Sequence, residues 1–355
     1  MSRVRLRALG IATGQLPTGT WNAITDVAGV RVGYSTLMRD APSIVRTGVT
    51  AIWPRTSDIW GEAVFAGVHS FNGYGDMTGG WWIQEQGLLS APICLTNTYS
   101  VGVVRDAICA MGSHIARART VEQPLRVHLP VVAETYDGYL SDIDSQAVTR
   151  EMAFEALESA ASGPIAEGNV GGGTGMVCHE FKGGTGTASR RVPAGYTVGV
   201  LVQANHGQRE LLRIDGVAVG HAMDLERFPS PCRQAADAGS IIVIIATDAP
   251  LLPIQCQRLA RRATTGIAWV GGIGANSSGD LFLAFSTAAH IHDDAQLHDV
   301  QMLSPDGMTP LFQATAEATE EAILNALAMA TTTTGVGGRI AHALPLEFVR
   351  EMLLN

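Results

Sequence analysis

Apolar residues recur along the chain with two different periods, one typical of helices and the other typical of strands. Residues 103–117, 145–160 and 315–330 carry apolar side chains at helical spacing, which predicts three helices. Residues 240–248, SIIVIIATD, contain five β-branched residues in succession. A continuous apolar run of this length predicts a strand that is buried on both faces.

Shorter apolar runs between turn-forming residues predict further strands. Pro253 suits the first turn of a helix, and Gly266 suits its end. Because strands and helices are interleaved, the predicted class is α/β or layered α+β, with a sheet sandwich covered by helices. The remaining predicted strands are residues 29–33, 48–53, 127–133, 196–204, 266–270 and 281–286.

The composition indicates a folded protein with a large core, since hydrophobic residues make up 46% of the 355 residues and charged residues 16%. The net charge of −9, without a basic stripe, argues against nucleic acid as a partner and more weakly against anionic membranes. The basic N-terminal segment lacks the apolar run of a signal peptide, and no apolar stretch reaches the roughly 18 residues that span a bilayer. We therefore expect a cytoplasmic protein without a nucleic-acid or membrane partner.

The cysteines and histidines give little support to a metal site. The five cysteines are odd in number and have no C-x-x-C spacing, so reduced core thiols are expected. The metal-like cluster in the sequence is explained equally well by a polar loop. We expect no metal and no other cofactor. The cysteines are Cys94, Cys109, Cys178, Cys232 and Cys256, and the cluster is His290, His292, Asp293, Asp294 and His298.

The sequence lacks the glycine-containing motifs of nucleotide-binding proteins and of α/β-hydrolases. Residues 168–176, GNVGGGTGM, lack the third glycine of a dinucleotide fingerprint and the Gly-Lys-Ser/Thr of a P-loop. A tight turn that holds one backbone close to another is the expected role. The chain also has no G-x-S-x-G elbow, so an α/β-hydrolase serine is unsupported.

The most informative feature is Gly239-Ser240, where a polar segment at 222–239 meets the buried strand. If the bond between them were cut, Ser240 would gain a free α-amine with a pKa of about 7.7–8.0. That amine could accept the hydroxyl proton, so one residue would supply both the nucleophile and its base. Gly239 would allow the hydroxyl to approach the preceding carbonyl. Taken alone, Gly-Ser is more simply explained as a turn that enters a strand.

Further segments extend this pattern over most of the chain and in a consistent order. They are VAETYDG (132–138), GNVGGGTGM (168–176), LVQAN (201–205), GSIIVIIATDAPLL (239–252) and SGDLFLAFS (278–286). Together they resemble the DmpA-like L-aminopeptidase/D-amidase-esterase family, which includes the β-peptidyl aminopeptidases. The resemblance implies an α-β-β-α sandwich like that of DmpA and the ornithine acetyltransferases, analogous to N-terminal-nucleophile hydrolases.

The resemblance also implies a cleavage site and a catalytic group. Ser240 matches the family nucleophile, and cleavage after Gly239 would give an α-chain of residues 1–239 and a β-chain of residues 240–355. Ser278 and Asp280 match a Ser-Gly-acid element beside the nucleophile. Asn205 matches the amide that donates to the oxyanion, although Asn-His-Gly is also an ordinary turn sequence.

The remaining matched residues concern the substrate and the assembly. Glu134 matches a position near the substrate amine, where a carboxylate would pair with the free ammonium of a small peptide or amide. Tyr136 matches a phenol that could donate to the tetrahedral intermediate, and the neighbouring Tyr139 is an alternative. The family implies one catalytic domain over residues 1–355 and a homotetramer of cleaved protomers.

Two other functions fit parts of the same pattern. The Ala-Thr-Asp-Ala segment after the nucleophile also resembles the ornithine acetyltransferases, which transfer an acyl group to an amine instead of water, but their nucleophile is threonine. An uncleaved binding or scaffold protein with the same fold is the second alternative. Cleavage of the chain would separate the enzyme from the scaffold.

Overall fold

The computed structural model describes residues 3–118, 129–230 and 239–354, and its long strands form two sheets. The first sheet has the order β1 (Arg31–Arg39), β2 (Val45–Trp53), β5 (Ile93–Asn97) and β6 (Val131–Thr135). The second sheet has the order β4 (Leu88–Leu89), β3 (Glu62–Gly73), β12 (Gly279–His292), β11 (Ser240–Thr247), β10 (Thr197–Asn205) and β9 (Gly184–Arg191). Two short hairpins are β7 (Val177–Cys178) with β8 (Phe181–Lys182), and β13 (Thr333–Thr334) with β14 (Ile340–Ala341).

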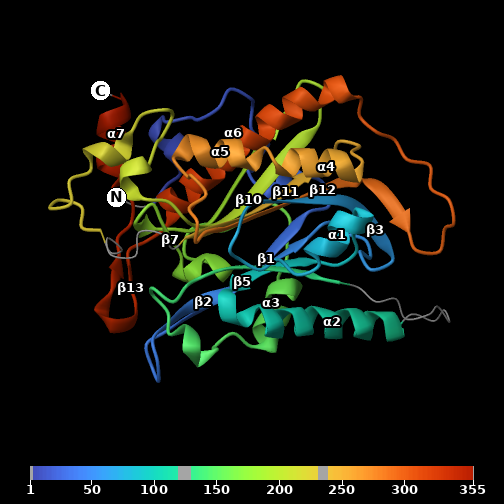
Figure 1. Cartoon of the computed structure of the whole chain (residues 1–355), viewed down its shortest axis with the longest axis horizontal. Coiled ribbons are helices and arrows are strands. Elements are labelled where there is room, and N and C mark those ends of the chain that lie inside the picture. The colour runs from blue at the N-terminus through green and yellow to red at the C-terminus, as the bar shows by residue number, and fades with distance from the viewer. Residues whose placement is uncertain (1–2, 119–128, 231–238, 355) are drawn as a thin grey trace.

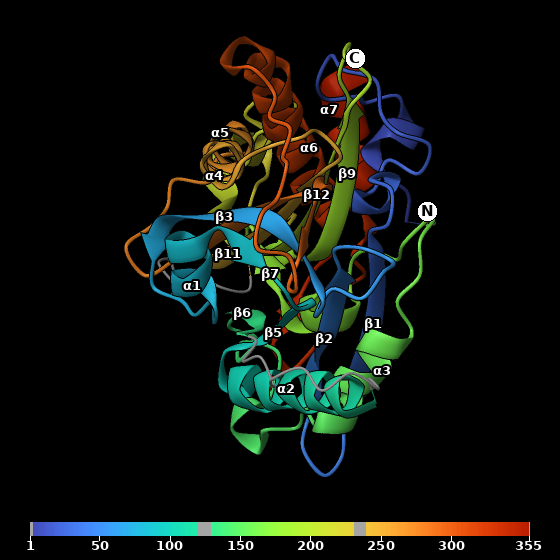
Figure 2. The same ribbon diagram turned by 90° about the vertical axis from the view of Figure 1, so that its right-hand side faces the viewer.

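Helices cover the outer face of each sheet, as the two ribbon views show (Figure 1, Figure 2). Helices α2 (Val101–Ala118) and α3 (Arg150–Glu158) pack on the first sheet. Helices α4 (Pro253–Ala260), α5 (Ala263–Val270) and α6 (Met308–Met329) lie on the second sheet's side. The layers are therefore α-β-β-α, which confirms the predicted fold class. The other helices are α1 (Gly80–Gln86) and α7 (Leu346–Leu354).

Short 3-10 helices connect these elements. They are η1 (Leu6–Leu9), η2 (Ile24–Asp26), η3 (Thr98–Ser100), η4 (Ile143–Ser145), η5 (Gly171–Gly175), η6 (Arg209–Leu211), η7 (Val219–Ala222), η8 (Pro305–Gly307) and η9 (Val336–Gly338). Within the described residues, no helix combines the length and the apolar character needed to cross a bilayer.

Strand β11 is buried on both faces, as its unbroken apolar sequence predicts. Ile241 and Val243 belong to the core between the second sheet and its helices. Ile242 and Ile244 belong to the other core, between the two sheets. Successive side chains of a strand point to opposite faces, so each layer needs an apolar residue at every second position.

One predicted strand is wrong. Residues 266–270 are helical and belong to α5, which ends at Gly271, where φ is +100°. Gly266 therefore does not end a helix. It lies inside one, where a Cβ would come within 2.4 Å of the carbonyl oxygen of Ala316 on α6. The missing side chain allows two helices to approach closely. In the sequence, a glycine with this packing role gives the same signal as a glycine at a helix end.

Other predicted boundaries differ in length. The strand predicted at 281–286 is part of the longer β12, and the strand predicted at 127–133 ends two residues later, as β6. The three helices predicted from apolar spacing are confirmed as α2, α3 and α6. Residues 231–238, within the polar segment 222–239 that precedes Ser240, lie outside the described residues.

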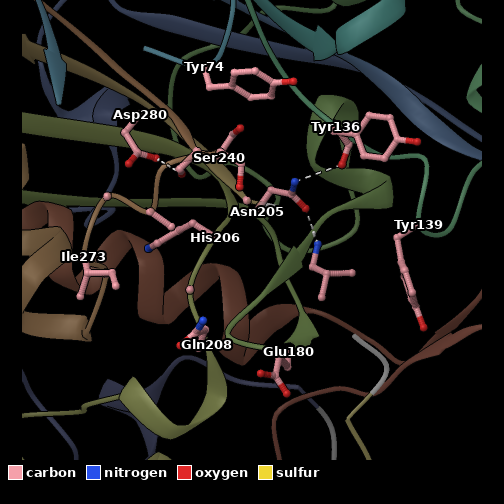
Figure 3. A pocket seen from close by; sticks show the side chains of 18 of the residues that line it. Tyr74, Tyr136, Tyr139, Glu180, Asn205, His206, Gln208, Ser240, Ile273 and Asp280 are labelled. Carbon is pink, nitrogen blue, oxygen red and sulfur yellow. Dashed lines mark hydrogen bonds between the residues drawn. The ribbon is translucent and has the colours of Figure 1, made fainter. Parts of the chain in front are cut away.

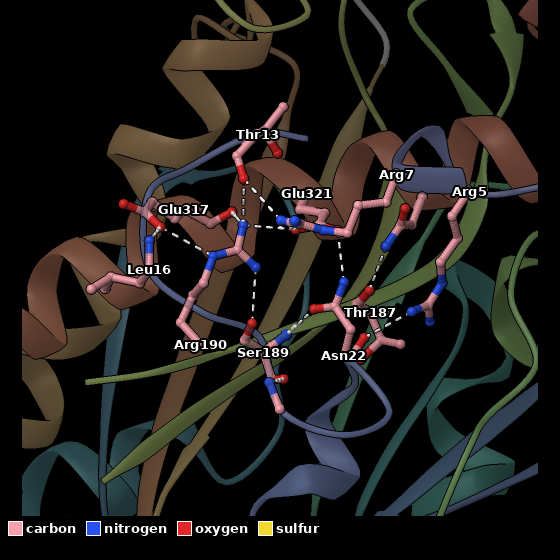
Figure 4. A network of polar contacts seen from close by, with 12 residues as sticks. Arg5, Arg7, Thr13, Leu16, Asn22, Thr187, Ser189, Arg190, Glu317 and Glu321 are labelled. Carbon is pink, nitrogen blue, oxygen red and sulfur yellow. Dashed lines mark hydrogen bonds and ion pairs between the residues drawn. The ribbon is translucent and has the colours of Figure 1, made fainter. Parts of the chain in front are cut away.

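A buried ionic network joins the N-terminal segment to α6 (Figure 4). The guanidinium of Arg190, on β9, pairs with Glu317 at 3.1 Å and with Glu321 at 2.7 Å. Arg7 also pairs with Glu321 at 2.7 Å, and the amide of Asn22 donates to it at 2.6 Å. Removing one partner of a buried pair typically costs about 3–5 kcal/mol. These contacts link residues on opposite sides of Gly239-Ser240 without a disulfide.

Candidate active site

The ends of three neighbouring central strands of the second sheet lie side by side. Ser240 begins β11, and its neighbours across the sheet are Asn205, the last residue of the antiparallel strand β10, and Gly279, the first residue of the parallel strand β12. Asp280 pairs in register with the next residue, Ile241. Residues far apart in the sequence are therefore brought together by strand register.

The hydroxyl of Ser240 is buried in a hydrogen-bonded pocket (Figure 3). Its Oγ accepts a hydrogen bond of 3.0 Å from the backbone N–H of Gly279. Beside it, the hydroxyl of Ser278 donates to Asp280 at 2.6 Å. Burial raises the pKa of Asp280 to about 6, although hydrogen bonds from Ser278 and from the backbone of Ile241 oppose this rise. A carboxylate in this position can hold a cation near Ser240.

The side chain of Asn205 is held by hydrogen bonds at both ends of its amide. Its Oδ1 accepts from the backbone N–H of Val177 at 2.7 Å, and its Nδ2 donates to the backbone carbonyl of Tyr136 at 3.0 Å (Figure 3). An amide nitrogen carries two N–H groups, so one can still be donated. A donor fixed next to a nucleophile can stabilise a developing oxyanion without reorganisation.

The glycine-rich segment 168–176 provides the position of Val177. Its glycines form η5 and touch neighbouring backbones, because a Cβ on Gly172 would lie 2.1 Å from Gln203 Oε1 and one on Gly173 would lie 2.2 Å from the backbone nitrogen of Thr185. The predicted tight turn is confirmed. It places the N–H that orients the amide of Asn205.

Glu134 is a buried carboxylate beside Gly75. Its Oε1 accepts from the backbone N–H of Asp76 at 3.0 Å, and its Oε2 accepts from the hydroxyl of Thr98. A Cβ on Gly75 would be 3.1 Å from this carboxylate and also 3.1 Å from the Cα of Gly279, whose N–H binds Ser240. The carboxylate of Glu134 therefore lies near the strand end that carries Ser240, and both residues line one pocket.

Comparison with known proteins shows the family to which the chain belongs. The model of Peptidase family S58 matches residues 22–341. The chain belongs to this peptidase family. It is 46% identical to the beta-peptidyl aminopeptidase BapA of Sphingosinicella microcystinivorans, over 98% of this chain and 91% of that protein.

Two solved structures share the fold of this S58 chain over nearly its whole length. A beta-aminopeptidase from Burkholderia sp. matches with a TM-score of 0.92 and 48% identity, covering 99% of this chain and 98% of that one. The L-aminopeptidase D-Ala-esterase/amidase of Ochrobactrum anthropi matches with a TM-score of 0.92 and 43% identity, with the same coverage. That protein is described as a variant of the Ntn hydrolase fold.

Several tyrosines line the S58 pocket, which has a volume of about 920 Å³. The ring of Tyr136 lies beside Gly138, where a Cβ would be 2.3 Å from the phenol oxygen, and 47% of the residue is exposed. Burial is the main cause that raises the pKa of Tyr136, so the phenol stays protonated and can donate. Tyr139 and Tyr74 line the same pocket.

Some residues of the pocket are not indicated by the sequence. Tyr74 follows β3, and its backbone N–H donates to the carbonyl of Ser278, so a loop distant in sequence forms a wall beside Ser240. Arg339 enters from the C-terminal part and lies 5.3 Å from the ring centroid of Tyr139. His206 also lines the pocket. Neither Tyr74 nor Arg339 stands in a segment whose local pattern indicates chemistry.

The metal-like cluster of the sequence is not assembled into such a site. His290 and His292 lie near the end of β12 that is remote from Asp280, and both contact Glu62, which also pairs with Arg55 at 2.8 Å. Their partner is a carboxylate already held by a guanidinium. Among the described residues, neither histidine belongs to a group of three or more side chains that could hold one ion.

Burial of Asp280 also has a consequence for stability. In a chain kept uncut by Ser240→Ala, the raised pKa means that ionising Asp280 costs folding free energy above about pH 6, and that this cost vanishes below about pH 4. Adding Asp280→Asn should therefore raise the free energy of unfolding at pH 7.5 by on the order of 2 kcal/mol. Denaturant melts at pH 7.5 and pH 4 measure this. An equal effect at both pH values would contradict a buried charge at Asp280.

Proposed function

We propose that this chain is a self-processing aminopeptidase that uses Ser240 as its nucleophile. The observation that carries the proposal is the position of Ser240 Oγ, which shares one pocket with the amide of Asn205 and the carboxylate of Glu134. An activated hydroxyl, an oxyanion donor and an anchor for an amine are the three groups that release of an N-terminal residue requires. Membership of a peptidase family supports this reading.

The first reaction in the proposal is cleavage of the chain itself. Gly239 lines the same pocket, and a Cβ there would lie 2.9 Å from the Cα of His206 and 3.0 Å from the carbonyl oxygen of Asn205. The hydroxyl of Ser240 attacks the carbonyl carbon of Gly239. The C–N bond then breaks as the nitrogen takes a proton, and water hydrolyses the resulting ester. The products are residues 1–239 and 240–355.

The freed α-amine then activates the same hydroxyl for substrate. The neutral amine takes the proton as Oγ attacks the scissile carbonyl, and Asn205 donates to the oxyanion. The amine passes the proton to the leaving amine, and a water molecule hydrolyses the acyl-enzyme. Asp280 and Ser278 hold the ammonium form of the base between these steps. None of these reaction steps requires a cofactor.

The proposed substrates are small peptides, amino-acid amides and esters that carry a free N-terminal amine. Glu134 would pair with that ammonium, since its carboxylate lines the same pocket as Ser240. Both α- and β-amino-acyl groups are included, since the similar proteins are named as beta-aminopeptidases and as an L-aminopeptidase.

Blocking the substrate amine tests the role of Glu134. N-Acetylation of an amino-acyl p-nitroanilide removes the positive charge, so turnover is expected to fall by at least about 10²-fold, and Glu134→Gln should reduce activity on the unblocked substrate by a similar factor. Steady-state rates on both substrates with both proteins measure this. Equal rates for the acetylated and unblocked substrates would rule out an amine anchor at Glu134.

The proposal extends to the assembly and its place in the cell. We propose that residues 1–355 act as one catalytic domain, in a cytoplasmic homotetramer of cleaved protomers. Trp81 and Trp82 on α1 are 84% and 40% exposed and offer an apolar surface for such contacts. Light scattering of the purified enzyme tests the tetramer, and a monomer at micromolar concentration would exclude it.

A further inference from the structure

A second group of reactive side chains lies next to the serine pocket. Cys178 ends β7, His179 follows it in the hairpin turn, and His206 follows Asn205 after β10. One ligand atom from each of the three residues lies within 4.8 Å of the others, and all three side chains are buried. The Sγ of Cys178 is 3.8 Å from Nδ1 of His206.

The turn that presents His179 has an uncommon backbone. Cys178 pairs with Phe181, so the hairpin loop consists of His179 and Glu180, and these have φ values of +46° and +59°. Turns of this kind favour asparagine and glycine, because other residues pay a steric cost of roughly 1–2 kcal/mol in the left-handed region. Strained positions cluster at sites that bind ligands.

The ring of His179 is oriented so that one nitrogen can act as a ligand. Its Nδ1 is 2.9 Å from the backbone carbonyl of Gln208, so Nδ1 carries the proton and Nε2 has the lone pair. Within the described part of the chain, Nε2 of His179 is buried and has no hydrogen-bond partner, while His206 presents its Nδ1 to the thiol of Cys178. A buried polar atom without a partner is costly, and an absent ion is one explanation for it. A carbonyl that fixes the tautomer is a common support for a metal-binding histidine.

We propose that Cys178, His179 and His206 bind a zinc-like divalent transition metal ion, and that the bound ion slows the serine reaction. One thiolate and two imidazoles are a ligand set that zinc and cobalt prefer. Metal–ligand bonds of about 2.0–2.3 Å separate tetrahedral ligand atoms by roughly 3.3–3.6 Å, so small side-chain rotations suffice. The thiol loses its proton to solvent as the S–metal bond forms.

The bound ion would act on the serine reaction through Asn205, the residue that precedes His206. His206 lines the serine pocket and follows Asn205, which pairs in register with Ser240. Gly207 and Gly272 leave room for the two rings, because a Cβ on Gly207 would lie 2.4 Å from the ring of His179 and one on Gly272 would lie 3.1 Å from the ring of His206. Pulling His206 toward the ion would shift the backbone that carries the oxyanion donor.

Cobalt titration of the purified, metal-free enzyme tests the site directly. We expect one equivalent of Co²⁺ to produce a thiolate-to-cobalt charge-transfer band, and Cys178→Ser to weaken binding by at least about tenfold and remove that band. Cys109→Ser is the matched control, since Cys109 is a half-buried thiol outside the group. Thermal melts of each variant without metal confirm that it is folded. No band in the wild type, or a band that persists in Cys178→Ser, would overturn the site.

Activity assays test the regulatory half and separate it from the serine mechanism. Zinc is expected to lower kcat severalfold in the wild type, reversibly with a chelator, and to have much less effect in Cys178→Ser. Equal inhibition of the two proteins would overturn this half. Chelator alone should leave activity intact, because the serine route requires only a base and an oxyanion donor. An enzyme inactivated by chelator and restored by zinc would contradict the proposed serine mechanism while leaving the metal site in place.

Discussion

Ser240→Ala is expected to lower kcat/KM by at least about 10⁴-fold and to leave the chain uncut. The hydroxyl is the only reacting atom that the substitution removes, and its hydrogen bond from Gly279 shows that it is already held in place. The alanine side chain fits the same space, so the fold should remain intact. Rates on an amino-acyl p-nitroanilide and melting temperatures of both proteins check this result.

A neighbouring serine supplies the control for this experiment. Ser277 lines the same pocket, but its hydroxyl has no hydrogen-bond partner among the residues that the structure describes. Ser277→Ala should therefore cleave normally and keep most of the activity. A Ser240→Ala protein that retained activity, or a Ser277→Ala protein that lost as much as Ser240→Ala, would show that the nucleophile has been assigned wrongly.

Asn205→Ala is expected to reduce kcat by about 10²–10³-fold with a smaller change in KM. The amide is held by Val177 and Tyr136, so its remaining N–H is fixed before the oxyanion forms. An interaction made only in the transition state lowers kcat and kcat/KM together. Asn205→Asp should be at least as slow, because it keeps the acceptor for Val177 but places a negative charge beside the oxyanion.

Kinetics of the Asn205 variants must be measured on protein that has been cleaved, since the same donor would assist self-cleavage. Asn276→Ala is the control, because Asn276 is an exposed amide in the nearby loop. A kcat within about threefold of the wild type in Asn205→Ala would assign the oxyanion donor to another group.

The sequence predicted the local elements that carry the site, because their signals are local. The five β-branched residues after Ser240 predict a strand buried on both faces, and β11 has an apolar side chain in each core. The meeting of Ser240 with Asn205 and Asp280 depends on strand register, which the residues alone do not determine. From the sequence, these residues are placed in one site by the resemblance to a known family together with the residue patterns.

Other features depend on contacts that a single sequence does not encode locally. A glycine such as Gly266 gives the same sequence signal whether it ends a helix or lies at a helix crossing. The close approach of α6 shows that Gly266 lies at a crossing. The pocket wall at Tyr74 and the cluster of Cys178 with His206 join segments that are far apart in the chain. The histidines at the end of β12 look like ligands in the sequence, yet their partner is Glu62.

Intact mass under denaturing conditions tests the central claim most directly. Purified wild-type protein, incubated at neutral pH, is expected to give two chains of 239 and 116 residues (355 minus 239), with the smaller one beginning at Ser240. The Ser240→Ala protein should give one chain of 355 residues under the same conditions. Wild-type protein that remains a single chain of full mass while it hydrolyses substrate would contradict the account, because Ser240 would then have no free amine to act as its base.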